Sequence, residues 1–129
     1  MKTDTEWLAV VDEADRPRTG RPRGTLGPSD IFRVACLWLT DERERVVIAR
    51  RAATKAHDAL RWGPPVAGTV QLGESYRANL MRESEEEMGW RPPEVREGPK
   101  VLIRTDECRF FCQWFLGALT EPADELLRP

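Results

Sequence analysis

Short apolar runs separated by polar turns follow one another along this sequence and predict a protein built mainly of β-strands. The run at residues 31–39 is almost entirely apolar, which predicts a strand buried on both faces of a sheet. Residues 45–51 return after the charged turn 41–45, so the two runs are expected to form a hairpin. Further strands are predicted at residues 7–11, 66–73, 101–104 and 109–119.

Two segments lack this pattern and predict loops. Residues 16–28 are basic and rich in Pro and Gly, which predicts a loop without regular structure. Arg21 and Arg23 in this loop are candidates for contacts with phosphate, although a solvated loop explains the same composition. Residues 52–66 are also expected to form a loop.

One segment, from Ser75 to Gly89, predicts a helix. Ser75 can cap its first turn, Gly89 can end it, and Pro92 cannot continue it. The side chains expected to face the sheet are Arg77, Leu80, Met81, Ser84 and Met88. The order of strands and helix is typical of an α/β protein with one mixed sheet and a helix packed on it.

The composition fits a single soluble domain. The chain has 129 residues, and its 20 basic and 22 acidic side chains give a formal net charge of −2. This charge leaves no bulk basic field for a nucleic acid polymer or an anionic membrane. The first residues carry no apolar signal segment and the longest apolar run is far below a membrane span, so a cytoplasmic protein is expected.

The three cysteines, Cys36, Cys108 and Cys112, match no zinc-ligand spacing, since a single histidine accompanies them. Cys36 and Cys112 lie in apolar runs and are expected to be small buried residues with reduced thiols. A zinc site is therefore not expected.

Glu83, Glu86 and Glu87 share one face of the predicted helix, because residues three and four apart are neighbours on a helix. Like charges at this spacing repel, and no basic residue follows Arg82 within the acidic run to relieve the repulsion. Carboxylate oxygens gathered on one side are the ligands that Mg²⁺ and Mn²⁺ prefer. By itself, this arc fits either a divalent-metal site or an acidic surface facing solvent.

Residues 68–90 place this arc in a longer motif. The spacing Gly-x5-Glu-x7-Arg-Glu-U-x-Glu-Glu-x-Gly-U, in which U is a bulky apolar residue, is met by Gly68, Glu74, Arg82, Glu83, Glu86, Glu87, Gly89 and Trp90. The segment resembles the Nudix box and departs from it at Ser84, where the family has an aliphatic residue that packs on the sheet. We expect this exchange to cost about 1 kcal/mol of packing and to leave the carboxylates unaffected.

The resemblance implies a Nudix-like α/β/α sandwich in which the box, residues 68–90, forms a loop, a helix and a second loop. It implies one Nudix domain over residues 1–129, short at its C-terminus. The activity implied is hydrolysis of a diphosphate bond in a nucleoside diphosphate derivative or related pyrophosphate, with Mg²⁺ or Mn²⁺ as cofactor. The implied metal ligands are the carboxylates of Glu83, Glu86 and Glu87 with a backbone carbonyl near Ala67 and Gly68. Arg82 would pair with Glu74 or with a ligand carboxylate and orient the helix.

Weaker similarity outside the box indicates the branch of the family that includes isopentenyl-diphosphate isomerase. It rests on residues 10–15, 49–51 and 71–75, on Lys55 and on Trp62. The isomerase has a reactive Cys and a metal-binding His beside the box glycine, where this chain has Ala67 and Thr69. The single histidine, His57, lies in a loop before the box and cannot replace several imidazoles, so isomerase chemistry is not expected.

Substrate contacts are expected from residues before the box. Arg50, Arg51 and Lys55 follow a strand that should lead towards the cleft, and they can contact phosphates, although a solvated strand end explains them equally well. Trp62, beside Gly-Pro-Pro, is the candidate for stacking on a base or lining the pocket.

Three functions remain open from the sequence. The first is the metal-dependent hydrolase, in which Glu83 or Glu87 could act as general base, with Glu107 as a further candidate that a plain turn also explains. The second is a catalytically weak Nudix-like domain that binds a nucleotide for regulation. The third is an acidic scaffold domain without a ligand. Beyond a small-molecule diphosphate, an uncovered apolar sheet face would favour a homodimer.

Overall fold

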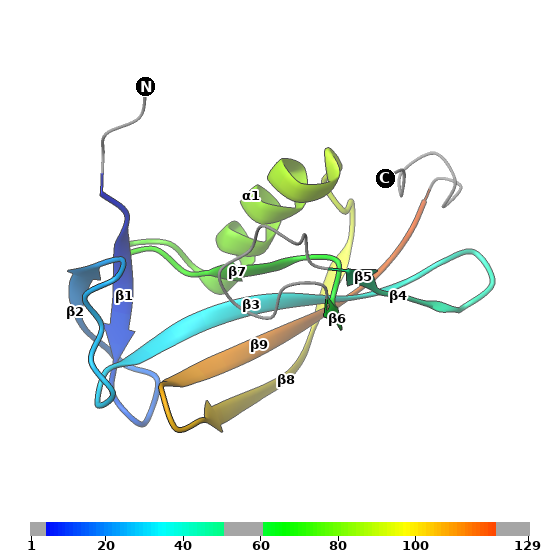
Figure 1. The fold of residues 1–129 in the computed structure, drawn as a ribbon. Helices are drawn as coiled ribbons and strands as arrows, with labels where there is room; N and C mark the ends of the chain where they lie inside the picture. Colours follow the sequence, from blue (N-terminus) through cyan, green and yellow to red (C-terminus); the bar gives the residue numbers. More distant parts are fainter. Residues whose placement is uncertain (1–4, 51–60, 121–129) are drawn as a thin grey trace.

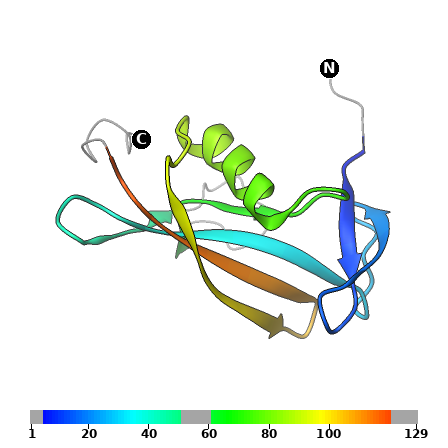
Figure 2. The same cartoon turned by 180° about the vertical axis from the view of Figure 1, so that it is seen from behind.

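The structure, a computed structural model, describes residues 5–50 and 61–120. In this part of the chain one helix, α1 (Tyr76–Met88), lies over one face of a mixed β-sheet (Figures 1 and 2). The helix begins because Ser75 Oγ accepts a hydrogen bond from the Ala78 amide at 3.0 Å. It ends at Gly89, whose φ of 65° favours glycine. The predicted helix is confirmed, and the described residues contain no helix able to cross a membrane.

The main sheet has seven strands in the order β2-β1-β3-β9-β8, with β4 and β7 also paired to β3. These strands are β1 (Trp7–Val11), β2 (Pro17–Pro22), β3 (Ile31–Thr40), β4 (Val46–Val47), β7 (Ala67–Thr69), β8 (Val95–Arg104) and β9 (Arg109–Ala118). A two-stranded sheet joins β5 (Ala49–Arg50) and β6 (Trp62–Gly63). β3 is parallel to β9 and antiparallel to β1, β4 and β7, so the predicted mixed sheet is confirmed.

β1, β7 and β4 pair in succession with one edge of β3, while β9 pairs with the other edge. Among the described strands, β7 pairs only with β3. Its outer edge therefore carries no further strand of the described chain, and β7 lies beside α1 (Figure 1).

The core lies between α1 and the sheet. Leu37 and Leu39 of β3 pack with Phe115 of β9 and Leu80 of α1, and all four are essentially buried. The opposite face of β3 is less covered, and Trp38 on it is 46% exposed. Cys36, on the same face as Trp38, is buried, so the prediction that residues 31–39 are buried on both faces is wrong at Trp38.

Several strand and loop predictions need correction. The loop predicted at 52–66 contains β6 (Trp62–Gly63), and the strand predicted at 66–73 is limited to β7 (Ala67–Thr69). Residues 17–22 form β2 instead of an irregular loop, because Pro17 and Pro22 stand at the two ends of an edge strand, where proline is tolerated. The strand predicted at residues 45–51 is divided at Ile48 into β4 and β5, which pair with different partners. The strand predicted at 101–104 begins earlier, at Val95, because a register shift between Glu97 and Lys100 accommodates Gly-Pro within it.

Candidate functional site

Glu83 lies against the backbone of Gly68, where α1 meets β7. A Cβ atom at residue 68 would come within 2.3 Å of Glu83 Cγ and within 2.8 Å of Glu83 Cδ. Only glycine therefore allows the helix to approach β7 this closely. The Glu83 side chain is 17% exposed, so it stands at the rim of this contact.

The carbonyl groups of β7 alternate between its two edges. Val66 O, just before the strand, accepts a hydrogen bond from the Leu37 amide at 3.0 Å and so points towards β3. Thr69 O points to the outer edge and accepts from Asn79 Nδ2 at 3.0 Å. Because carbonyls two residues apart point to the same side of a strand, Ala67 O shares this outer edge beside α1.

Arg82 joins the acidic residues of the helix to the loop before it. Its Nε donates to Glu74 Oε2 at 2.9 Å and its Nη2 to Glu74 Oε1 at 3.3 Å. Its Nη1 lies 3.2 Å from Glu83 Oε1 and 3.4 Å from Glu86 Oε2. The hydrogen bond to Glu74 is the largest cause of a raised pKa at Arg82, and Glu83 and Glu86 add to it. The predicted pairing of Arg82 with Glu74 is therefore present in the structure.

Glu74 is held by more than Arg82. Its Oε1 also accepts from the Gln71 amide and from Asn79 Nδ2, both at 3.0 Å. Burial alone would raise the pKa of Glu74, but the hydrogen bonds from Arg82, Gln71 and Asn79 outweigh it and lower the pKa below its ordinary value of 4.5. Glu74 therefore stays a carboxylate that fixes Arg82.

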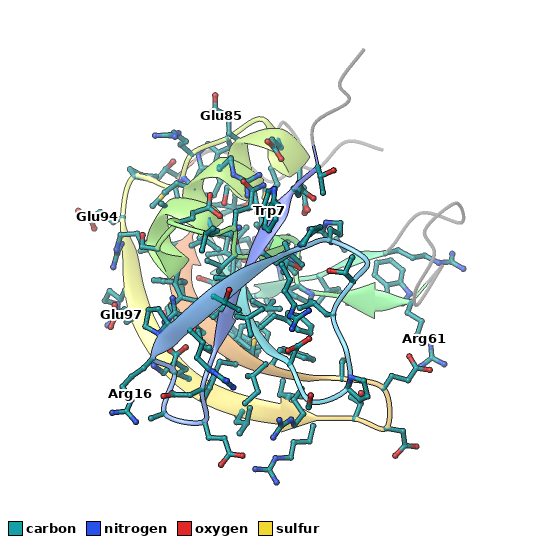
Figure 3. All side chains as sticks on the ribbon, turned by 90° about the vertical axis from the view of Figure 1, so that its left-hand side faces the viewer. Trp7, Arg16, Arg61, Glu85, Glu94 and Glu97 are labelled. Carbon is teal, nitrogen blue, oxygen red and sulfur yellow. The ribbon has the colours of Figure 1, made fainter. Side chains whose placement is uncertain are left out.

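Glu86 and Glu87 stand on the exposed side of α1. Glu85, which precedes them, points away from the body of the molecule and pairs with Arg91 at 2.7 Å (Figure 3). Within residues 5–50 and 61–120, no three His, Cys, Asp or Glu side chains converge tightly enough to hold a metal ion. In this arrangement the positive charge between Glu83 and Glu86 is that of Arg82.

The donor set nevertheless fits a hard divalent cation in its chemistry. Carboxylate and carbonyl oxygens are the ligands of Mg²⁺ and Mn²⁺. Gly68 leaves room for Glu83 beside the outer edge of β7, where Ala67 O lies. Glu86 and Glu87 follow Glu83 by three and four residues on α1, so the three carboxylates lie on one side of the helix.

The predicted substrate-binding residues lie only partly in the described chain. Arg50 and Trp62 are direct cross-strand partners between β5 and β6, and Trp62 is 63% exposed. Arg51 and Lys55 lie outside the described residues, as does His57.

Other candidate residues have structural roles in the described chain. Glu107 lies in the exposed turn between β8 and β9, where its amide donates to Thr105 Oγ1 at 3.2 Å. Arg21 pairs with Asp30 at 3.5 Å. Arg23, the other candidate for contacts with phosphate, also pairs with an acidic side chain, that of Glu6.

The cysteines agree with their predicted state. Cys36 and Cys112 are buried free thiols whose Sγ atoms lie 3.5 Å apart, and Cys108 is a half-buried free thiol. Burial and the neighbouring Cys112 raise the pKa of Cys36, with the hydrogen bond between the two thiols as the largest cause.

Sequence reasoning missed one residue of this site, Asn79. It is fully buried and connects β7 to Glu74. Its spacing offered a signal, because a residue four positions before Glu83 lies on the same helix face.

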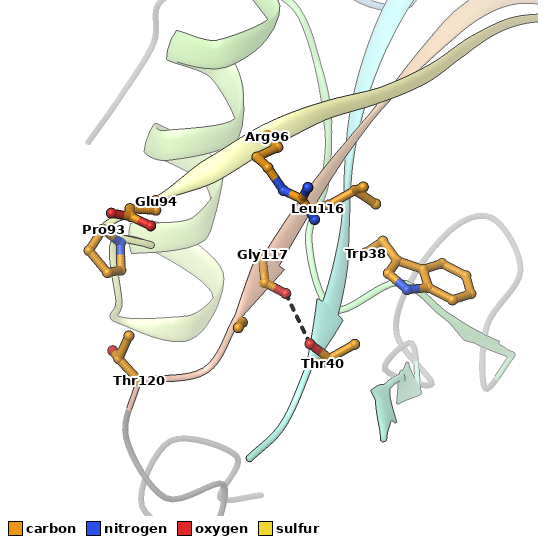
Figure 4. A pocket seen from close by; sticks show the side chains of 9 residues that line it. Trp38, Thr40, Pro93, Glu94, Arg96, Leu116, Gly117 and Thr120 are labelled. Carbon is orange, nitrogen blue, oxygen red and sulfur yellow. Dashed lines mark hydrogen bonds between the residues drawn. The ribbon is translucent and has the colours of Figure 1, made fainter. Parts of the chain in front are cut away.

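A separate groove lies at the sheet face that α1 does not cover (Figure 4). Its volume is about 650 Å³ and its lining includes Trp38, Arg96 and Leu116. A smaller hollow of about 310 Å³ continues over Pro99 and Trp114. Trp38, which lines both hollows, lies on the face of β3 opposite Leu37 and Leu39, which pack with α1.

Comparison with known proteins assigns the family. The model of the NUDIX domain family matches residues 31–128, which is most of the chain. The chain belongs to the NUDIX domain family, and the predicted resemblance is confirmed.

Individual relatives agree with this assignment. An uncharacterized Nudix hydrolase of Pseudomonas aeruginosa is 31% identical over 121 residues, which are 93% of this chain and 72% of the relative. Isopentenyl-diphosphate Delta-isomerase 2 of Photorhabdus laumondii is 32% identical over 94 residues, which are 68% of this chain and 50% of the isomerase. This chain thus spans about half of that enzyme's length.

The crystal structure of DR0079 from Deinococcus radiodurans has the same fold. It superimposes with a TM-score of 0.73 and 23% sequence identity, covering 90% of this chain and 74% of that protein. The predicted fold class is therefore confirmed.

Proposed function

We propose that the chain is a divalent-metal-dependent hydrolase of a diphosphate bond in a nucleoside diphosphate derivative or a related pyrophosphate. The observation that carries the proposal is the contact of Glu83 with Gly68, beside the Ala67 carbonyl edge of β7. Arg82 and Glu74 support this contact by fixing the helix to the preceding loop. Membership of the Nudix family agrees with this activity.

Each residue of the site has a role in this proposal. Glu83, Glu86 and Glu87, with the Ala67 carbonyl beside Gly68, would hold Mg²⁺ or Mn²⁺. When bound, such an ion neutralises phosphate oxygens and makes a bound water more acidic. Glu83 or Glu87 takes the proton of the attacking water.

Arg82 orients the carboxylates in the same proposal. Since Glu74 binds two of its nitrogens, Arg82 keeps its place when Glu86 turns away from it. Glu74 contributes through Arg82 and does not need to touch the substrate.

The substrate end of the site is proposed to lie at the small β5–β6 sheet. Arg50 and Trp62 are cross-strand partners there, so a guanidinium and an exposed indole occur together. A guanidinium binds phosphate and an indole stacks on a planar base. Arg51 and Lys55, outside the described residues, are proposed to add phosphate contacts.

One observation favours a second candidate function, a catalytically weak domain that binds a nucleotide for regulation. Arg82 Nη1 lies between Glu83 and Glu86, and no ready set of three metal-binding side chains is present in the described chain. If Arg82 keeps this position in solution, the site would bind a ligand without turning it over.

The test is product release from nucleoside diphosphate derivatives, dinucleoside polyphosphates and nucleoside triphosphates, with Mg²⁺ or Mn²⁺ and with chelator. The hydrolase is supported by metal-dependent turnover that is lost in Glu86→Gln and Glu87→Gln. Glu85→Gln is the matched control, because Glu85 is on the same helix but pairs with Arg91. Ligand-induced thermal stabilisation without product from any compound would support the binding domain instead.

The open face of the sheet supports a further part of the proposal, a homodimer. Trp38 and Val101 on this face are each 46% exposed, and exposed aromatic and aliphatic side chains are typical of interface cores. Light scattering after size exclusion should give the mass of two chains, and Trp38→Ser should reduce it to one. A wild-type protein that is monomeric at all concentrations would contradict the dimer.

A further inference from the structure

Asn79 is a fully buried amide at the contact of α1 with β7. Its Nδ2 donates to Thr69 O on β7 at 3.0 Å and to Glu74 Oε1 at 3.0 Å. One side chain on the helix therefore binds both the outer edge of a strand and the carboxylate that fixes Arg82.

The oxygen atom of the same side-chain amide makes no such contacts. Asn79 Oδ1 is buried and has no hydrogen-bond partner. It lies 2.7 Å from the place that a Cβ atom of Gly68 would occupy, so it packs on the same glycine as Glu83. A buried polar atom without a partner lowers stability, and an apolar side chain here would avoid this cost.

The two Nδ2 bonds reach both sides of the candidate metal site. On one side, Thr69 O lies on the same edge of β7 as Ala67 O, because carbonyls alternate along the strand. On the other side, Glu74 binds Arg82, whose Nη1 contacts Glu83 and Glu86. Asn79 is the link between the carbonyl side and the carboxylate side.

We propose that Asn79 is a positioning residue of the metal site, fixing the distance between the carbonyl edge of β7 and the carboxylates of α1. This inference rests on the proposed metal-dependent function. It assigns no contact of Asn79 with substrate or metal. Its effect passes through the Thr69 carbonyl and the Glu74 carboxylate.

The test compares Asn79→Ala with wild type in metal affinity, measured by electron paramagnetic resonance of Mn²⁺. Removing residues that orient metal ligands commonly weakens metal binding by about 10–100-fold, and a weakening in this range is expected. Ser84→Ala is the matched control. Ser84 is also fully buried on α1, but its hydroxyl donates only to Leu80 O of the same helix, at 2.7 Å. Its Mn²⁺ affinity should equal that of wild type.

Hydrogen exchange of the Gln71 amide gives a second readout without metal. This amide donates to Glu74 Oε1, so its protection depends on how firmly Glu74 is held. Asn79→Ala should lose this protection while Ser84→Ala keeps it. A merely structural role would lower the melting temperature of Asn79→Ala and leave both Mn²⁺ affinity and Gln71 protection unchanged.

A measurement on the wild type covers the case in which Asn79→Ala does not fold. The side-chain amide protons of Asn79 should exchange slowly with solvent, because the residue is fully buried and its Nδ2 makes two hydrogen bonds. Fast exchange of these protons would overturn the inference, as would equal Mn²⁺ affinity of folded Asn79→Ala and wild type. A wild type that binds no Mn²⁺ would overturn the proposed function, and this inference with it. That result is distinct from the case in which wild type and Asn79→Ala bind equally.

Discussion

Arg82 and Glu74 are joined by two hydrogen bonds, so the helix that carries the acidic arc is tied to the loop before it. The Glu74 side chain is 14% exposed and the Arg82 side chain 31%. The pair is thus shielded from solvent more than a surface ion pair, whose contribution to stability is usually small.

Replacing Glu74 should make the stability of the protein less dependent on pH. The folded-state pKa of Glu74 is lowered, so its stabilising contribution is present above the ordinary value of 4.5 and is lost as the pH falls through the folded-state pKa. Glu74→Gln should therefore lose about 1–3 kcal/mol at neutral pH and progressively less below pH 4.5. Urea unfolding of wild type and Glu74→Gln across this pH range measures the difference in stability. A difference that does not change with pH would contradict the role given to Glu74.

Gly68→Ala should separate α1 from β7. The added methyl group would come within 2.3 Å of Glu83 Cγ and 2.7 Å of Asn79 Oδ1. We expect a loss of about 1–3 kcal/mol from overpacking, together with loss of metal-dependent activity. Gly63→Ala is the control, because a Cβ there meets no atom of the described residues within 4 Å. Equal unfolding midpoints for the two variants would show that the close approach at Gly68 is not needed.

Outside the candidate site, Asp15 should be one of the acidic residues whose replacement lowers the stability of the protein most. Its carboxylate accepts from Arg33 Nε and Lys100 Nζ at 2.7 Å and from the Tyr76 hydroxyl at 2.9 Å, and its side chain is 6% exposed. Asp15→Asn keeps a residue that tolerates the φ of 61° there. It breaks a buried ion pair, so a loss of about 3–5 kcal/mol is expected.

The control for Asp15 is a carboxylate of the same turn. Glu13→Gln removes a charge that is 72% exposed and pairs with Arg109 at 3.4 Å. Thermal unfolding should show little change for it, since exposed pairs contribute about 0–1 kcal/mol. Similar losses of stability for Asp15→Asn and Glu13→Gln would contradict the larger contribution given to Asp15.

Ser84→Ala should be tolerated or mildly stabilising. The Ser84 hydroxyl bonds to a carbonyl of its own helix, Leu80 O, so its removal leaves no atom of the sheet unpaired. Alanine also has the higher helix propensity, by about 0.5 kcal/mol. Chemical unfolding should give a free energy equal to or above that of wild type. A clear loss would mean that the hydroxyl contributes more than this one bond.

The sequence predicted the parts of the fold that depend on local signals. The helix is bounded by Ser75 and Gly89 as predicted, because a side-chain cap and a left-handed glycine act within one turn. β2 was missed because Pro17 and Pro22 look like breakers until their place at a sheet edge is known. The exposure of Trp38 could not be predicted, since it depends on which elements cover the face of β3.

The candidate site also combines features that the sequence predicts with features that it does not. Its acidic arc follows from helical spacing, and the pairing of Arg82 with Glu74 was expected from the family resemblance. The link through Asn79 was not predicted, because it requires the Thr69 carbonyl and the Glu74 carboxylate to meet at one point in space. Likewise, the position of Arg82 between Glu83 and Glu86 is set by side-chain rotation that spacing does not determine.

The most direct test of the metal site is anomalous diffraction from crystals of this protein soaked in Mn²⁺. We expect a peak at about 2.1–2.3 Å from carboxylate oxygens of α1 and from Ala67 O, the range of oxygen ligands around such ions. Arg82 should then be turned away from Glu86 while it still binds Glu74. A crystal without this peak, in which Arg82 Nη1 stays between Glu83 and Glu86, would contradict the proposed metal-dependent hydrolase.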